Sequence, residues 1–101
     1  MPIHRTATFR VRPDAVKAAL AAVREFVAYV AANEPGTLHY TSLRSTDEAA
    51  SFVHHFAFVD RAALEVRASS EGVDRFTGVL YQFVEGEVEF RDYDLVATTR
   101  Q

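Results

Sequence analysis

The boundary between a helix and a strand falls in Asn33-Glu34-Pro35-Gly36-Thr37-Leu38-His39-Tyr40. Asn33 is a predicted left-handed C-cap, and Pro35-Gly36 prevents the helix from continuing. Upstream, Pro13-Asp14 opens a helix that is predicted to run to about residue 32, because valine and leucine recur there every three or four residues. Downstream, the pattern predicts a strand at residues 37–44.

Three more strands are predicted around this boundary. Residues 3–12 alternate between apolar and polar side chains, which is typical of a strand with one buried face. Residues 51–59 follow a polar connection at residues 45–50 and form a predicted hairpin with the preceding strand. After a turn at Glu85-Gly86, a last strand is predicted from residue 87 to about residue 98.

The remaining segments predict two more helices and complete the fold. Asp60 can cap a short helix at residues 61–68, and Ser69 or Ser70 can cap one at about residues 71–84. The resulting order is a ferredoxin-like βαββαβ fold of the α+β class, with a four-stranded antiparallel sheet and helices on one face. A chain of 101 residues is too short for two cores, so residues 1–101 are predicted to form a single domain.

The other face of this sheet predicts a partner. The strand at residues 51–59 is apolar on both sides, with Phe52, Phe56 and Phe58 on one side and Val53, Ala57 and Val59 on the other. A strand of this kind is normally buried on both faces, so we expect a homodimer through the sheet face, as in a dimeric α/β barrel. In the last strand the apolar positions change phase at Arg91-Asp92, which predicts a bulge or a bend and a tail that pairs partly with the second subunit.

Composition excludes several classes of function. There are 11 lysines and arginines against 14 acidic residues, and a net charge of −3 does not favour nucleic acid as a partner. No apolar run approaches the ~20 residues that cross a bilayer, so no membrane partner is predicted. The sequence has no cysteine, hence no disulfide and no thiolate metal site, and the expected location is the cytoplasm.

The four histidines, His4, His39, His54 and His55, all lie on predicted strands. His54 and His55 are adjacent and point to opposite faces, so they cannot bind one ion together. The spacing matches no metal motif and no metal site is predicted, although His4, His39 and one of the later pair could still meet in space. Each histidine is either a hydrogen-bonded strand residue or a functional group that acts as a general base or hydrogen-bonds a substrate, since its pKa lies near neutrality.

Tyrosine and arginine supply further candidates. Tyr40 and Tyr81 are either aromatic residues at the rim of the core or hydroxyl donors to a bound phenol or quinone. Arg67 is either a surface residue or the group that stabilises an anion at the mouth of a cavity. Nucleophile elbows, P-loops and dinucleotide-binding glycine loops do not occur in the sequence.

Nearly the whole chain resembles the antibiotic biosynthesis monooxygenase family of dimeric α+β barrels. The resemblance is carried by the following segments: Phe9-Arg10-Val11-Arg12-Pro13, Asn33-Glu34-Pro35-Gly36-Thr37-Leu38-His39-Tyr40, Ser51-Phe52-Val53-His54-His55-Phe56, Asp60-Arg61-Ala62-Ala63-Leu64, and the closing stretch from Arg75-Phe76 to Ala97. It implies a quinol-monooxygenase-like enzyme that works without a cofactor.

The resemblance also shows departures. Haem-degrading members carry Asn, Trp and His near positions that here read Ala7, Arg67 and Phe76–Thr77, which disfavours haem degradation. Quinol-oxidising members often show Glu-x-Trp and a late His where this chain has Phe56, Phe58 and Arg67, which implies a more apolar pocket.

The predicted function is therefore oxygenation or oxidation of a small aromatic hydroquinone or phenol, without metal, flavin or other cofactor. Catalytic roles are predicted for His54, His55 and Tyr81, and substrate-binding roles for Tyr40, Arg67, His39, Phe56 and Phe58. Two alternatives stay open. The domain could bind a small ligand without chemistry, or it could be a non-oxidative isomerase or cyclase on the same barrel.

Overall fold

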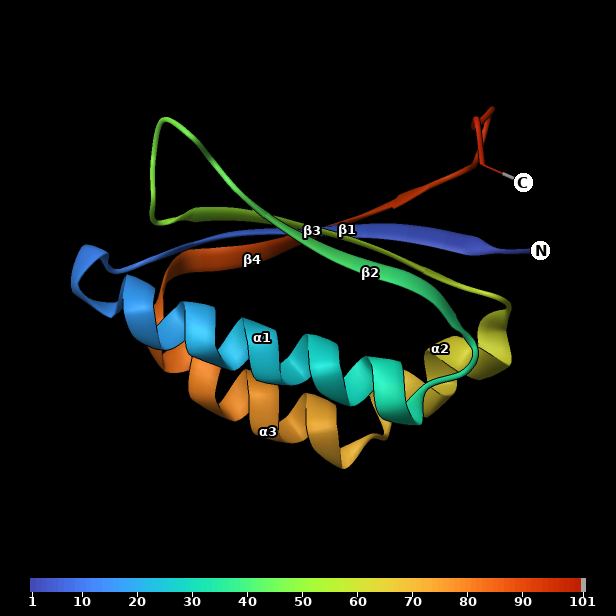
Figure 1. The fold of residues 1–101 in the computed structure, drawn as a ribbon, viewed down its shortest axis with the longest axis horizontal. Helices are drawn as coiled ribbons and strands as arrows, with labels where there is room; N and C mark the ends of the chain where they lie inside the picture. Colours follow the sequence, from blue (N-terminus) through green and yellow to red (C-terminus); the bar gives the residue numbers. More distant parts are fainter. Residues whose placement is uncertain (101) are drawn as a thin grey trace.

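The computed structural model describes residues 1–100 and places helices along one face of a four-stranded antiparallel sheet (Figure 1). The strand order is β2-β3-β1-β4. The strands are β1 (Ile3–Val11), β2 (Thr37–Arg44), β3 (Ser51–Phe58) and β4 (Val84–Tyr93). The helices are α1 (Val16–Asn33), α2 (Arg61–Ala68) and α3 (Glu71–Leu80), with short 3-10 turns at Pro13–Ala15 and Tyr81–Phe83. This confirms the predicted ferredoxin-like α+β fold.

The core lies between the two central strands and the helices. Phe9 and Val11 of β1 and Phe52 of β3 are buried there, and Phe9 stacks on Phe52 at 5.3 Å between ring centroids. Helix α1 packs Ala19, Val23, Phe26 and Val30 against the sheet. Val16 and Leu20, which the valine and leucine periodicity places on the inward face, are half-buried, whereas Ala19 is fully buried.

The predicted N-caps of the later helices are confirmed, with one choice settled. Asp60 Oδ1 accepts a hydrogen bond from the Ala63 N–H at 3.0 Å, and Ser70 Oγ accepts one from the Val73 N–H at 2.9 Å. Ser69 instead ends α2, where its own N–H bonds to the last carbonyls of that helix. These caps satisfy backbone donors that a helix start leaves unpaired.

The left-handed C-cap predicted at Asn33 is wrong. Asn33 is the last residue of α1, and its Nδ2 donates to the Tyr29 carbonyl at 3.0 Å. The next residue, Glu34, has left the helical conformation, with φ −124°. Among residues 1–100, no residue other than glycine has a positive φ. Pro35 accounts for this ending, because a residue that precedes proline is driven out of the helical region toward extended backbone.

Strand β4 also differs from the prediction. It begins at Val84 and ends at Tyr93, and its irregularity lies at Gly86, where φ is +75° and the pairing with β1 shifts register between Thr8 and Arg10. Of the predicted bulge or bend at Arg91-Asp92, the bulge is absent, because the pairing with β1 is regular there. The apolar positions change sides there without a bulge, since Phe90 lines the cavity on the helix side and Tyr93 pairs with His4 on the other face.

The face of the sheet away from the helices is uncovered in the single chain (Figure 1). We call it the open face. Val53 and Val59 are 40% and 44% exposed, so the predicted burial of β3 on both faces does not hold for one chain, in which Ala57 alone of that set is buried. Leu43 and Tyr93 are also exposed. Within the part of the chain described, no helix combines the length and the apolar character needed to cross a membrane.

Gly36 is required by a close approach between the start of β2 and helix α2. A Cβ atom at Gly36 would lie 2.6 Å from the Cβ of Ala63. Because both groups belong to packed elements, we expect Gly36→Ala to lower the free energy of unfolding by about 1–3 kcal/mol, as overpacked cores do. Urea unfolding measures this change.

Gly78→Ala is the matched control for this prediction. Gly78 lies within α3, and a Cβ atom there would have no neighbour within 4 Å. Alanine is the better helix former, so this variant should gain about 0.5–1 kcal/mol. Equal effects of the two substitutions would contradict the close contact at Gly36.

Candidate functional site

A cavity of about 260 Å³ lies between the sheet and the helices. Its walls come from β1, β2, β3 and β4 together with α1, α2 and α3, and they are mostly apolar. Six of the eight predicted site residues line it, namely Tyr40, His54, Phe56, Phe58, Arg67 and Tyr81. A dry apolar cavity of about 150 Å³ can hold benzene, so this one has room for a substituted aromatic ring.

His54 is the titratable base inside this cavity. It lies on β3, its side chain is 1% exposed, and its Nδ1 is 2.6 Å from the Tyr40 hydroxyl. The edge of its ring meets Phe9 at 5.0 Å between centroids. Burial lowers the pKa of His54 from 6.5 to about 4, so the imidazole is neutral at pH 7.

Tyr40 fixes the orientation of this imidazole. Its ring stacks on Phe56 and meets the edge of Phe26, and burial raises the pKa of its hydroxyl above the ordinary value. The neutral pair has two tautomers: His54 Nδ1 either accepts the Tyr40 proton or donates its own proton to the Tyr40 oxygen. In the second tautomer Nε2 is free to accept a proton. Nε2 is buried and has no hydrogen-bond partner among residues 1–100.

Arg67 forms a buried ion pair with Glu34 at one end of the cavity. Arg67 Nε donates to Glu34 Oε1 at 2.6 Å, and the two side chains are 10% and 3% exposed. Thr37 joins them, because its hydroxyl donates to Glu34 Oε1 and accepts from Arg67 Nη2. The alternative of a surface arginine is therefore wrong. Since Glu34 balances the charge, Arg67 offers less attraction to a substrate anion than a free arginine would.

Four aromatic rings surround the Arg67 guanidinium. Its carbon lies 4.9 to 5.5 Å from the ring centroids of Phe26, Tyr40, Phe56 and Phe58. Cation–π contacts of this kind stabilise a desolvated guanidinium. Phe56 and Phe58, for which substrate binding is predicted, line the cavity and also contact the ion pair through Arg67.

The sequence prediction missed Glu34 as a member of this site. The sequence around Glu34 indicates only a turn, and its buried partner, Arg67, lies 33 positions away in the chain. No local pattern signals such a pairing. Phe26 and Phe76 also line the cavity, and helical periodicity in the sequence predicts an inward position for both.

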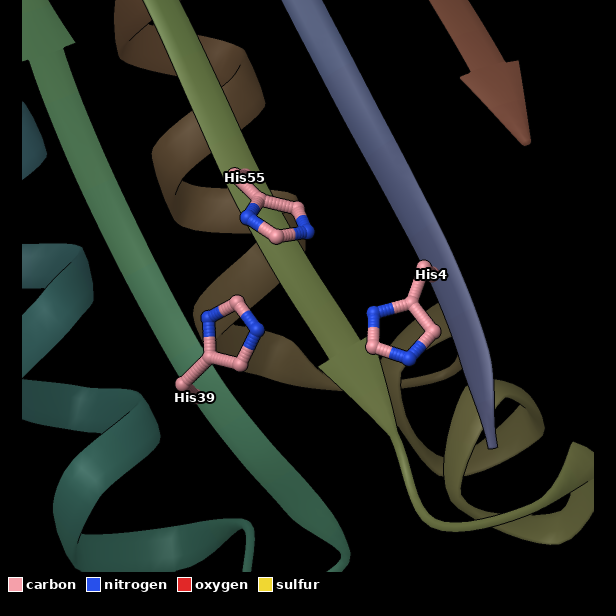
Figure 2. Close-up of side chains that lie close together, drawn as sticks. All are labelled: His4, His39 and His55. Carbon is pink, nitrogen blue, oxygen red and sulfur yellow. The ribbon is translucent and has the colours of Figure 1, made fainter. Parts of the chain in front are cut away.

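The remaining predicted residues lie elsewhere. Tyr81 is at the cavity mouth and is 46% exposed. His39 and His55 do not line the cavity, so the roles predicted for them do not fit this site. Side chains alternate across a strand, and both residues lie on the open face. On that face they meet His4 (Figure 2). One nitrogen from each of these three histidines lies within 4.8 Å of the others, so the spatial cluster considered as an alternative does form.

Burial of neutral His54 has a consequence for stability. As pH falls through 6.5, the unfolded chain takes up a proton at His54 that the folded chain takes up only near pH 4. Unfolding is thereby favoured, and the contribution to the loss of stability between pH 7 and pH 4 is on the order of 3 kcal/mol. We expect the His54→Gln variant to lose less stability over this range than the wild type. Thermal unfolding at several pH values tests this, and parallel curves for the two proteins would contradict it.

Comparison with known proteins gives one family and a consistent fold. The family model described as Antibiotic biosynthesis monooxygenase matches residues 2–79. A solved antibiotic biosynthesis monooxygenase is 23% identical, with a TM-score of 0.86 over 94% of this chain and 99% of that one. A protein from Mycobacterium tuberculosis is 20% identical, with a TM-score of 0.87 over 99% and 100%. A variant of SnoaB from Streptomyces nogalater, a cofactor-independent oxygenase, is 19% identical, with a TM-score of 0.83 over 99% and 98%. The curated proteins give no significant match.

Proposed function

The chain belongs to the antibiotic biosynthesis monooxygenase family, and we propose that it oxygenates a small aromatic hydroquinone or phenol in the cavity beside His54. The family and the likeness to a cofactor-independent oxygenase support a monooxygenase-like function in general. The finer proposal rests on one observation. A mostly apolar cavity of about 260 Å³ contains one neutral imidazole that a tyrosine holds in place.

The residues of this chain have a simple task in the proposed reaction. A substrate hydroxyl donates its proton to His54 Nε2 while Nδ1–H bonds to the Tyr40 oxygen. The resulting anion is electron-rich and passes electrons to O₂. For a hydroquinone, the substrate and O₂ together give a hydroxyquinone and water, so one oxygen atom enters the ring and the other leaves as water. The substrate supplies all the electrons, and the proposal therefore includes no cofactor.

The volume and the lining of the cavity support a small substrate. Ligand pockets usually measure about 300–1,000 Å³, and this one lies just below that range. Ala7, Arg67, Phe76 and Thr77 line the cavity, and these are the positions at which haem-degrading relatives are expected to carry their functional side chains. None of those side chains is present, so we favour a single substituted ring over a porphyrin.

We also propose that the protein is a homodimer through the open face and that it works in the cytoplasm. The dimer proposal is supported by the uncovered sheet and by the apolar side chains of Leu43, Val53 and Tyr93 that it exposes. Large apolar side chains on a sheet face are typical of a surface that a partner covers. The proposed location agrees with a sequence without cysteine.

Oxygen consumption tests the proposed function. Purified protein is incubated with a panel of hydroquinones, naphthols and anthrones in the presence of a chelator, and autoxidation is subtracted. Enzyme-dependent uptake with one-ring substrates is the expected result. Saturable binding without uptake would favour a binding domain in its place, and product formation without uptake would favour an isomerase or cyclase.

A further inference from the structure

We propose that His4, His39 and His55 bind a divalent transition-metal ion, with Zn²⁺ as the ion that fits best, on the open face of the sheet (Figure 2). This goes beyond the proposed function, because the cluster lies across the sheet from the cavity and shares no residue with it. It also departs from the expectation, drawn from sequence spacing, that the chain has no metal site.

Strand register brings the three rings together. His4 on β1 and His39 on β2 both pair with Ala57, which lies between them on β3. His55 is two positions along β3 and therefore on the same face. The rings of His4 and His39 lean from β1 and β2 toward β3, which lies between them (Figure 2). Ring centroids are 4.5 Å apart for His39 and His55, 5.9 Å for His4 and His55, and 6.4 Å for His4 and His39.

The nitrogen atoms of this cluster have unused bonding capacity. His4 Nε2 and His39 Nδ1 are both buried, and neither has a hydrogen-bond partner within residues 1–100. Buried polar nitrogen without a partner is costly, so two such atoms in one cluster indicate a ligand that satisfies them.

The chemistry of the donor set selects the class of ion. Three neutral imidazoles suit Zn²⁺, Co²⁺, Ni²⁺ and Cu²⁺ and do not suit Mg²⁺ or Ca²⁺, which require oxygen ligands. Three histidines around Zn²⁺ leave a fourth position open for water or another donor. At Zn–N distances of about 2.0–2.1 Å, tetrahedral ligand atoms are about 3.3 Å apart. The nitrogens here lie within 4.8 Å of one another. The three side chains are half-buried, and small rotations of their rings would bring the nitrogens to the shorter separation of a zinc site.

Cobalt titration tests the site directly. Full-length protein without an affinity tag is titrated with Co²⁺, and visible absorption reports both the coordination geometry and the number of ions bound. We expect one ion per chain, with the intense bands of a four-coordinate site, and displacement of Co²⁺ by Zn²⁺. Zn²⁺ should also raise the Tm of the wild type, since a ligand that binds the folded state stabilises it.

Substitutions identify the ligands. His4→Gln, His39→Gln and His55→Gln should each weaken Co²⁺ binding by at least about 100-fold, since even second-shell changes cost about 10–100-fold. The matched control is His54→Gln, which removes the adjacent histidine on the other face and should leave the affinity unchanged. Circular dichroism confirms that each variant is folded. Failure of the wild type to bind Co²⁺ below millimolar concentration, or equal losses in His54→Gln and His55→Gln, would overturn the proposal.

Discussion

Glu34→Leu is expected to lower the free energy of unfolding by about 3–5 kcal/mol, because it leaves the Arg67 guanidinium buried without its carboxylate. Leucine is apolar but similar in size to glutamate, so loss of side-chain volume does not account for the effect. Glu34 also accepts the hydrogen bond from Thr37, which is lost at the same time. Urea unfolding at pH 7 measures the change. The free energy of unfolding of a small domain is about 5–15 kcal/mol. A loss at the upper end of the expected range would therefore leave the variant with little stability.

A double variant separates the ion pair from local packing. Replacing Arg67 as well, as Glu34→Leu/Arg67→Met, removes the unpaired charge and should recover most of the lost stability. The matched surface control is Glu25→Ala in α1, which breaks an exposed pair with Arg75 and should have little effect. If the double variant were as unstable as Glu34→Leu, packing at position 34 and not the ion pair would explain the loss.

His54→Gln is expected to reduce kcat about 10²–10⁴-fold for any substrate that the oxygen assay identifies, which is the usual contribution of a general base. Glutamine can still bond to the Tyr40 hydroxyl but cannot accept the substrate proton. Substrate binding should change much less than turnover, because the apolar walls of the cavity are unaltered. Steady-state oxygen uptake and a separate ligand-binding titration measure the two quantities.

His55→Gln is the informative comparison for this prediction. The two histidines are adjacent in sequence and identical in chemistry, and they differ in the face of the sheet on which they lie. In metal-free protein, His55→Gln should keep turnover close to the wild-type value. A large loss in His55→Gln with turnover retained in His54→Gln would show that the chemistry is not in the cavity on the helix side.

The fold was predictable because short-range patterns determine most of it. The caps at Asp60 and Ser70, the break at Pro35-Gly36 and the alternation of β1 are all local, and the structure agrees with them. The course of β4 was less predictable. The irregularity at Gly86 depends on pairing with β1, far away in sequence, and a change in apolar phase near Arg91 imitated a bulge that does not exist.

The site was predictable in its residue types and not in its geometry. Alternation placed His54 on the same side of β3 as Phe52 and Phe56, but both sides of that strand are apolar, so the sequence could not show which side faces the helices. The pairing of Glu34 with Arg67 and the meeting of His4, His39 and His55 are long-range contacts. The histidine cluster follows from strand order and register, and the ion pair follows from the packing of α2 beside the end of α1. No local pattern determines either of them.

The alternation along β3 also bears on how this protein can evolve. Codons 54 and 55 are neighbours, yet a substitution at one changes the cavity and a substitution at the other changes the open face. Point mutation can therefore vary the two sites independently. A deletion of one residue early in β3 would exchange the environments of all later side chains at once, placing a histidine of each site on the wrong face. We therefore expect length changes in homologous chains to fall in the connection at residues 45–50 and to be excluded from the strand.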